Sequence, residues 1–318
     1  MMGGPERWLS LWGGFAWRGL GRKGLGLDIL KAPVAFWSAL VLACLCIAAF
    51  GAPLLAPYDA FDPGSANVAD ARLPPGSHGM FGDSYPLGTD PQGRDLLSAM
   101  MYGLRTSLAV GFGSVVLAAL VGVTLGLLSG YFGGILDAVV MRIADIQLSL
   151  PPILVALLID GVTLAMLDRA RHDLLAIPTL ILAISTSLWV QFARTVRART
   201  QIEKNKDYVL AARISGVGTF RVLTAHILPN VGVPALVIAT VNLAVAILVE
   251  ATLSFLGVGV PATQPSLGTL VRIGNEFLFS GDWWMSILPG GLLVAVALSI
   301  NLLGDWLRDR LDPTTRTP

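Results

Sequence analysis

Residues 231–255 read VGVPALVIATVNLAVAILVEATLSF, a run in which Glu250 is the only ionisable side chain. A helix that crosses the hydrocarbon core of a bilayer needs about 20 mostly apolar residues, because the core is about 30 Å thick and each residue rises about 1.5 Å. This run is therefore long enough to span a membrane. Its apolar character is continuous and does not alternate with period two, which excludes a strand of a transmembrane barrel.

Five further runs share this character, and the composition of the whole chain agrees with them. Of the 318 residues, 54% are hydrophobic and only 14% are charged, whereas soluble domains carry about 25% charged residues. Backbone groups find no water partner in lipid, so each spanning run must form a helix. The sequence thus predicts an all-α integral membrane protein of about six transmembrane helices. The other runs cover residues 34–55, 107–128, 138–159, 175–193 and 285–304.

The distribution of basic residues predicts the orientation. With the N-terminus inside, sixteen Lys and Arg side chains fall in inner segments and six in outer ones. Cytoplasmic loops carry the excess of Lys and Arg, so we expect both termini in the cytoplasm. Residues 1–33 then form a cytoplasmic N-terminal segment. Its Trp and Phe residues recur at helical spacing and suggest a short interfacial helix, while its many glycines leave an unstructured tail as the alternative.

Small residues recur every fourth position along the second run, and residues four apart share one face of a helix. Such a face lets another helix approach closely. We interpret it as a packing surface within a helix bundle. Its members are Ser114, Ala118, Gly122, Gly126 and Gly130.

Acidic residues at membrane depth are costly and face protein or water. Glu250, with Ser254 close behind it, is therefore a candidate to line a solute path or an inter-subunit contact. The alternative is a partly buried carboxyl that is hydrogen-bonded to its neighbours. Asp145 follows Arg142 by three residues, and we expect these two to pair on one helix.

No pattern for catalysis or for a cofactor of the chain's own is found. The sequence lacks a GxxxxGK[ST] loop, HExxH and GxSxG, so we expect no ATP site and no enzyme activity in this chain. Its three histidines are scattered, and its two cysteines, Cys44 and Cys46, lie in one apolar run; neither set predicts a metal site. The formal net charge of +1 gives no reason to expect nucleic-acid binding.

The long, basic inner segment between the fourth and fifth runs is the most informative. Residues 201–215 can form a helix, Gly216 and Gly218 permit a turn with positive φ, and residues 219–228 can form a second helix. We expect that second helix to end before Pro229, because the residue preceding proline avoids the helical region. Two short helices joined by a glycine turn suit docking into a groove on a soluble partner, although a tight cytoplasmic loop is the simpler alternative.

At these residues the chain resembles the permeases of ATP-binding-cassette importers. Their coupling segment reads E-A-A, three residues, G, nine residues, I-x-L-P. Ala211, Ala212, Gly216, Leu228 and Pro229 match it at the same spacing. Two positions depart: Leu210 replaces the Glu, which removes any polar contact of that acid, and His226 replaces the Ile.

Two further stretches resemble the C-type permeases of the dipeptide, oligopeptide and nickel branch. LGTDPQGRD at 87–95, continuing to YGLRTSL at 102–108, is similar to the outer approach to their second helix. EATLSFLG at 250–257, with PSLG at 265–268, is similar to the end of their fifth helix. The resemblance implies a type I importer permease fold over residues 34–318, with a core of about 103–305, in a bacterial plasma (inner) membrane.

The resemblance also implies partners and a mechanism. This chain and a B-type permease would form a heterodimer with the solute path between them, set in the lipid bilayer. Two cytoplasmic ATP-binding subunits, which bind the ATP and Mg, would receive the 206–229 segments, and an extracytoplasmic solute-binding protein would deliver the solute. Three readings of the transported solute or energy source remain: short peptides; nickel, glutathione or another small solute; or, in a different class, a secondary transporter, which would show inverted repeats and several mid-membrane acids.

Overall fold

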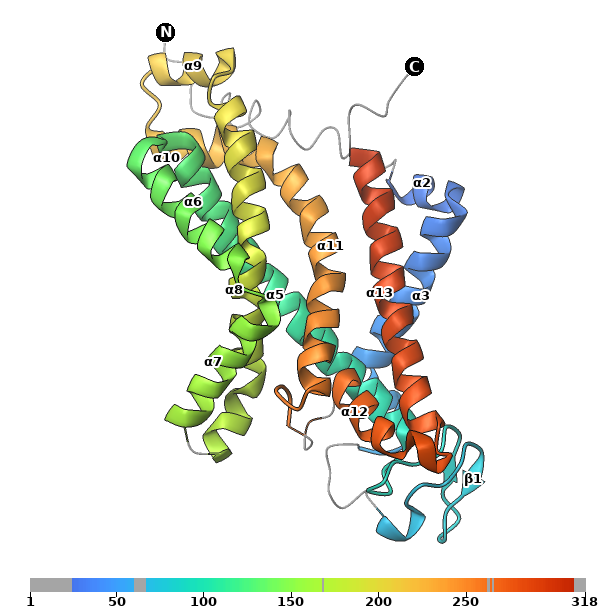
Figure 1. Ribbon diagram of the computed structural model, residues 1–318. Helices are drawn as coiled ribbons and strands as arrows, with labels where there is room; N and C mark the ends of the chain where they lie inside the picture. The colour runs from blue at the N-terminus through green and yellow to red at the C-terminus, as the bar shows by residue number, and fades with distance from the viewer. Residues whose placement is uncertain (1–24, 60–66, 168, 262–263, 265, 312–318) are drawn as a thin grey trace.

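The computed structural model describes residues 25–59, 67–167, 169–261, 264 and 266–311 and is almost entirely helical (Figure 1). The suggested interfacial helix, at Trp8, Leu11, Trp12 and Phe15, lies outside the described residues. The elements are α2 (Leu25–Lys31), α3 (Pro33–Phe50), α4 (Ala52–Leu55), η2 (Val68–Asp70), β1 (Ser77–His78), β2 (Ser84–Tyr85), α5 (Leu96–Phe132), α6 (Gly134–Ser149), α7 (Pro152–Met166), α8 (Arg169–Glu203), α9 (Asp207–Ile214), α10 (Thr219–Arg221), η3 (Val222–Ile227), α11 (Leu228–Phe255), α12 (Leu267–Phe277), η4 (Leu278–Ser280) and α13 (Trp284–Leu311).

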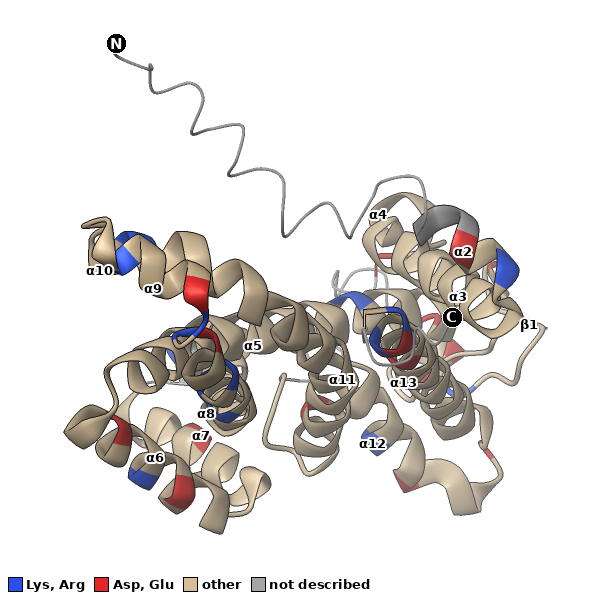
Figure 2. Ribbon diagram, turned by 90° about the horizontal axis from the view of Figure 1, so that it is seen from above, with Lys and Arg blue, Asp and Glu red and all other residues tan. Residues whose placement is uncertain are grey.

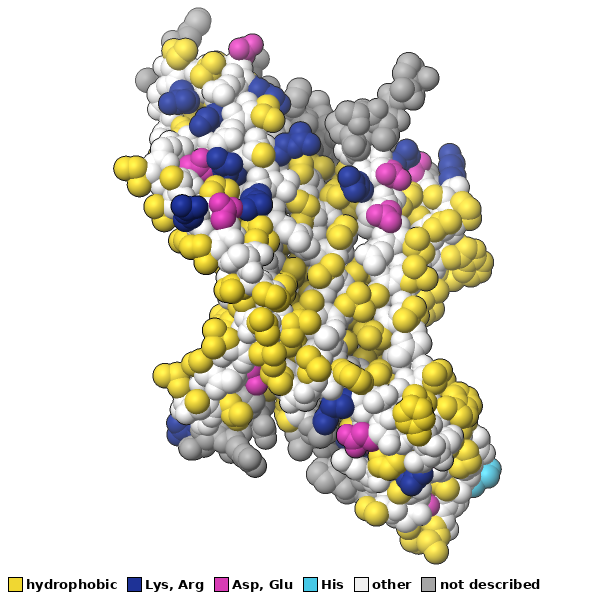
Figure 3. Space-filling model, viewed as in Figure 1, with side chains coloured by type: hydrophobic (Ala, Val, Ile, Leu, Met, Phe, Trp, Pro, Cys, Tyr) yellow, Lys and Arg dark blue, Asp and Glu magenta, His cyan; other side chains and the backbone are white. Residues whose placement is uncertain are grey.

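The all-α membrane architecture is confirmed. Five helices in the described residues are long and apolar enough to cross a membrane, and a sixth span is possible if one bent pair is counted as a single crossing. On the face shown in Figure 3, apolar side chains cover the middle of the molecule, and charged side chains gather toward its two ends. That distribution is expected of a chain solvated by lipid around its waist.

The third predicted span, residues 138–159, is wrong as one continuous helix. The chain forms α6 and α7 there, and their axes are bent by 93°. The cause is local: Pro151 and Pro152 are consecutive, and each lacks the N–H that would continue the hydrogen-bond ladder. Leu150, which precedes them, is extended (φ −98°, ψ 128°), as the residue before a proline prefers.

The longest helices extend well beyond their predicted runs. α5 has 37 residues, so it is about 55 Å long and must tilt to fit a hydrocarbon core of about 30 Å. Figure 1 shows it crossing the molecule diagonally. α8 has 35 residues and continues to Glu203, directly before the inner segment. α8 therefore links the membrane core to that segment in one rigid element.

The small-residue face of α5 lies against α8. A Cβ placed at Gly122 would be 2.4 Å from the Trp189 carbonyl oxygen, and one at Gly126 would be 2.6 Å from that of Ala193. One at Gly130 would be 2.8 Å from the Arg197 carbonyl oxygen. Ser114 and Ala118 are also fully buried in this stripe. The two backbones are thus too close for any side chain larger than hydrogen at the three glycines.

Replacing Gly126 with leucine is expected to destabilise the α5–α8 pair. The new Cβ would collide with backbone, which yields less easily than a flexible side chain, and overpacking costs about 1–3 kcal/mol or more. The loss is measured as a lower midpoint of thermal unfolding in detergent. Gly161→Ala is the matched control, because a Cβ at Gly161 in α7 meets nothing within 4 Å. Equal midpoints for the two variants would contradict the close packing.

The segment between α4 and α5 forms a small outer unit around buried polar groups. Asp70 accepts hydrogen bonds from the Asn67 amide (2.8 Å), the Met80 N–H (2.8 Å) and the Tyr85 hydroxyl (3.3 Å). Burial, followed by the nearby Asp70 carboxylate, raises the pKa of Tyr85 to about 12. A two-residue hairpin of β1 and β2 closes the unit.

Ion pairs fix this outer unit to the helices. Arg94 pairs with Asp90 at 2.6 Å, and both side chains are buried, so the pair holds the turn that precedes α5. Asp95 caps α5 by accepting from the Ser98 N–H at 2.8 Å. Arg72 reaches Asp282 at 2.5 Å, just before α13. The start of α5 and the start of α13 are therefore joined through one folded unit at the outer end.

Candidate functional site

The inner segment forms a compact projection, which we call the knob, from α9 through η3 (residues 207–227). Gly216 has φ +79°, a backbone conformation that residues other than glycine rarely adopt. It ends α9: the Gly216 N–H donates to the Arg213 carbonyl at 3.0 Å, and the Val217 N–H donates to the Ala212 carbonyl at 3.0 Å. These bonds satisfy the last carbonyls of the helix, as in a glycine C-terminal motif. The turn reverses the chain so that α10 follows.

The second inner helix does not end before Pro229, contrary to the prediction. The π-helical turn η3 continues directly into α11, which starts at Leu228 and contains Pro229 in its first turn. Proline is tolerated there because the first N–H groups of a helix have no internal partner. As a result, the knob is continuous with a spanning helix. The first inner helix is also shorter than predicted, since α8 runs to Glu203 and α9 begins at Asp207.

The knob presents apolar side chains outward while anchoring others in the core. Leu210 is 40% exposed, Ile214 88% and Phe220 80%. Val209, Val222 and Ile227 are fully buried in the main hydrophobic core. Ala211 and Ala212 lie on α9, and His226 lies in η3. Exposed apolar side chains grouped on one projection are typical of a protein-binding surface.

Tyr208 joins the knob to its two supporting helices, a role that sequence reasoning did not assign. Its hydroxyl donates to Glu203 at the end of α8 and accepts from the Asn230 amide at 2.9 Å. The same Asn230 amide donates to the His226 carbonyl at 2.8 Å. Burial raises the pKa of Tyr208, and the hydrogen bond to Glu203 raises it further. The phenol therefore remains protonated, and remains a donor, throughout the physiological pH range.

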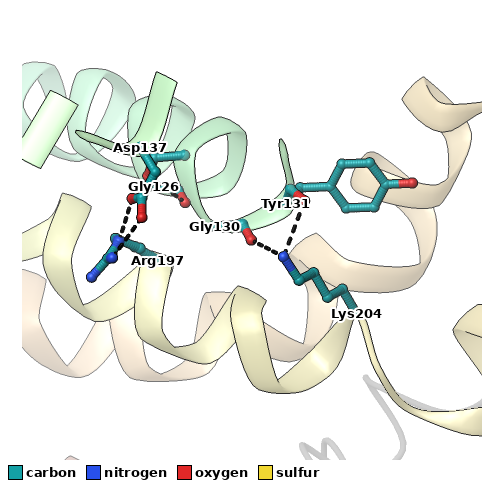
Figure 4. Close-up of polar contacts among 7 residues, drawn as sticks. Gly126, Gly130, Tyr131, Asp137, Arg197 and Lys204 are labelled. Atoms are coloured by element: carbon teal, nitrogen blue, oxygen red, sulfur yellow. Dashed lines mark hydrogen bonds and ion pairs between the residues drawn. The ribbon is translucent and has the colours of Figure 1, made fainter. Parts of the chain in front are cut away.

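Basic side chains of α8, and of Lys204 directly after it, clamp the α5–α6 corner (Figure 4). Arg197 binds Asp137 of α6 through two hydrogen bonds, one of them 2.6 Å between Nη2 and Oδ2. Lys204 donates to the carbonyls of Gly130 (2.8 Å) and Tyr131 (3.2 Å) at the end of α5. A cation at the carbonyl end of a helix is favourable because the helix dipole is negative there. α5, α6 and α8 are thus tied together directly beside the knob.

Asp145 pairs with Arg194 of α8, so the expected pair with Arg142 on the same helix is not the one formed. The reason is that α6 packs against α8, so the long Arg194 side chain can reach the Asp145 carboxylate from the neighbouring helix. Together with Arg197 and Asp137, this gives two ion pairs between α6 and α8. No signal in the sequence indicated which helix would supply the partner.

Glu250 lies wholly inside the chain, at 0% exposure. Its two carboxyl oxygens accept from the hydroxyls of Ser107 on α5 and Ser254 on α11, each at 2.7 Å. Ser107 in turn accepts from the Leu267 N–H at 3.3 Å. Glu250 therefore joins α5, α11 and α12, and in this conformation its side chain does not reach the surface of the chain.

Replacing Glu250 with alanine is expected to lower the stability of the chain. Two buried serine hydroxyls would lose their acceptor, and each unsatisfied buried polar group costs about 1–3 kcal/mol. The measurement is the midpoint of thermal unfolding of the purified chain in detergent. Glu250→Gln, which keeps one acceptor oxygen, should lower the midpoint less. An unchanged midpoint for the alanine variant would show that the chain does not depend on Glu250 to hold its helices together.

Comparison with known proteins identifies what the chain is similar to. Residues 122–317 match the family described as "Binding-protein-dependent transport system inner membrane component". The dipeptide transport system permease protein DppC of Haemophilus influenzae is 39% identical over 261 residues, covering 82% of this chain and 85% of that protein. The di/tripeptide permease DppC of Pseudomonas aeruginosa is 37% identical over 88% of both chains. The oligopeptide permease OppC of Bacillus subtilis is 34% identical over 97% of this chain and 91% of its own.

Proposed function

Because the chain belongs to the family of binding-protein-dependent transport system inner membrane components, we propose that it forms half of the translocation path of an ATP-driven importer for short peptides. The peptide substrate is supported by similar proteins that are named as dipeptide, di/tripeptide and oligopeptide permeases. Nickel, glutathione or another small solute is the alternative within the same fold. No observation on the described residues favours a secondary transporter.

The observation that carries the proposal is the knob and its attachment. An apolar projection with Ile214 and Phe220 exposed continues directly into α11 and follows α8 closely. Movement of such a projection by a docked subunit would therefore turn two spanning helices as rigid bodies. The knob stands at one side of the inner end, apart from α2 and α13 (Figure 2), so a partner has room to receive it.

The proposed mechanism assigns ATP hydrolysis to partner subunits. Two cytoplasmic ATP-binding subunits, which hold ATP and Mg, would bind the knobs of this chain and of a B-type permease. Their closure on ATP would move α8 and α11, and the path between the two permeases would change from inward-facing to outward-facing, as in alternating access. An extracytoplasmic solute-binding protein would deliver the peptide to the outer end.

The proposed orientation, for a chain in a bacterial plasma (inner) membrane, places the knob and both ends of the described chain on the cytoplasmic side. Asp28 of α2 pairs with Arg310 of α13, which holds the two ends side by side. In Figure 1 both lie at the same end of the molecule as α9. The excess of Lys and Arg in the predicted inner segments supports that end as cytoplasmic.

Purification of the chain from its native membrane in mild detergent tests the proposal. Mass spectrometry should identify a second permease and P-loop ATPases in the same complex. After reconstitution with its binding protein, the complex should take up dipeptides on addition of ATP. Recovery of the chain alone, under conditions that keep other complexes intact, would contradict the proposal. Uptake of nickel but not of peptide would show that the substrate is nickel.

A further inference from the structure

The break between α6 and α7 exposes main-chain groups at the middle of a membrane crossing. The two helices have 16 and 15 residues, so each is too short to span about 30 Å alone. α6 begins at the inner end, directly after α5, and α7 leads to the outer end, where α8 begins. Asp145, one turn before the break, contacts Arg194 in the inner half of α8. The break at 149–152 therefore lies near mid-membrane.

Three carbonyl groups at the break have no internal hydrogen-bond partner, because α6 ends there and Pro152 lacks an N–H. The Leu148 carbonyl would normally accept from residue 152, but Pro152 has no N–H. Within the described part of the chain, no hydrogen bond reaches the carbonyls of Leu148, Ser149 or Leu150; the Leu150 N–H uses Gln147, and Leu154 uses Pro151. The prolines also leave positions 151 and 152, directly before and at the start of α7, without N–H donors. The break is therefore rich in acceptors and poor in donors.

Lipid cannot cover this break. Each unsatisfied backbone group in hydrocarbon costs several kcal/mol, and irregular backbone at membrane depth occurs only where it is buried in protein or lines a water-filled cavity. Leu148 is 49% exposed and Leu150 48% exposed in this chain, so its own helices do not bury the break. The molecule is narrowed at the level where α6 and α7 meet (Figures 1 and 3).

We propose that the carbonyls of Leu148, Ser149 and Leu150 form a subsite on the translocation path that accepts hydrogen bonds from the ammonium and N–H groups of a passing peptide. This inference rests on the proposed function. It adds which main-chain groups line the path and which groups of the peptide they bind. The C-terminal end of α6 carries the negative end of the helix dipole, which favours a cationic group. A discontinuous spanning helix whose carbonyls face a solute path is a known device of transporters.

The test uses thiol labelling of the complete complex in lipid nanodiscs. The native thiols of this chain are removed by Cys44→Ala and Cys46→Ala, and Ser149→Cys is introduced. Leu40→Cys is the matched control, because Leu40 lies at mid-length of the unbroken helix α3 and is 42% exposed. The probes are methanethiosulfonates carrying either an ammonium or a sulfonate group, and their rates are normalised to those with a free small thiol.

The expected result is that the thiol introduced at position 149 reacts while the control thiol at position 40 stays unmodified. The cationic probe should have a normalised rate about fivefold above that of the anionic probe, the size expected of a helix terminus at short range. Millimolar dipeptide should slow the labelling, and an acetylated dipeptide, which lacks the ammonium group, should protect less. A Ser149→Cys variant that is as unreactive as the Leu40→Cys control would overturn the proposal, and so would labelling without charge preference or protection.

ATP-driven uptake by the same complex, carrying Ser149→Cys, separates this test from that of the proposed function. If peptide is transported while the introduced thiol does not react, or reacts equally with the cationic and anionic probes, the proposed subsite is wrong and the permease assignment stands. If the parent complex does not transport peptide, the assignment itself fails. As a second variant, Pro151→Ala with Pro152→Ala restores two N–H donors to the break and should raise the KM for dipeptide by several-fold.

Discussion

Gly216→Val is expected to reduce ATP-driven peptide uptake by about tenfold or more while the chain still inserts in the membrane. Gly216 has φ +79°, and an L-residue in the left-handed region costs about 1–2 kcal/mol, with β-branched residues at the upper end. Because about 1.4 kcal/mol is a factor of ten in an equilibrium constant, the ratio of molecules that keep the reversal between α9 and α10 to those that lose it should fall about tenfold. Uptake and ATP hydrolysis are measured on the same reconstituted complex.

Gly218→Ala is the matched control for this variant. Gly218 lies two residues away, has ordinary extended geometry (φ −61°, ψ 147°) and has nothing within 4 Å of an added Cβ. It should therefore transport as the parent does. If Gly216→Val assembles and transports normally, the turn is not required for coupling. If Gly218→Ala fails as severely, the segment tolerates no change of sequence, and its backbone conformation is not the cause.

Arg197→Glu is expected to lower the number of peptides transported per ATP hydrolysed by about tenfold. The Arg197–Asp137 pair is bidentate and partly buried, with side-chain exposures of 32% and 15%, and hydrogen bonds between charged groups contribute about 1.5–3 kcal/mol. Its loss would separate α6 from α8 beside the knob. ATP hydrolysis should then continue with less transport, because the moving knob no longer carries the α5–α6 corner.

Charge reversal on both sides is the control for a purely structural defect. Asp137→Arg alone should also lower the number of peptides transported per ATP hydrolysed. The double variant Arg197→Glu with Asp137→Arg should recover much of that number. Arg194→Glu should cost less than Arg197→Glu, since the Arg194–Asp145 pair is 46% and 55% exposed and exposed pairs contribute about 0–1 kcal/mol. A double variant no better than the singles, or an Arg194 variant that is equally impaired, would refute the clamp as the transmitting contact.

Much of the fold was predictable because a bilayer constrains the length and the apolar character of any segment that crosses it. Length and continuous apolarity are enough to locate a spanning helix, so five of the six runs contain a single long helix. The helix–glycine–helix shape of the inner segment was also legible, since Gly216 supplies the conformation that ends α9. Pro151 and Pro152 carried the signal for the broken third span, but the hydropathy of the run concealed it.

Helix ends were harder to place, because hydropathy reports on lipid contact and not on hydrogen bonding. α5 and α8 extend far beyond their apolar runs, where other helices and the outer unit support them. Pro229 was predicted to end a helix. In the structure it is the second residue of α11, which continues directly from the π-helical turn η3.

The sequence by itself determined the class of the molecule, the order of its spans and the turn at Gly216, because each follows from local composition or from a single backbone conformation. Only the tertiary structure decided which side chains meet. Asp145 pairs with Arg194 on another helix, Glu250 is held by Ser107 across 143 residues of chain, and Tyr208 joins two helix ends. The physical reason is that these contacts depend on how helices far apart in the sequence cross in space. For α5 and α8, the crossing is set by the close backbone approach at Gly122, Gly126 and Gly130.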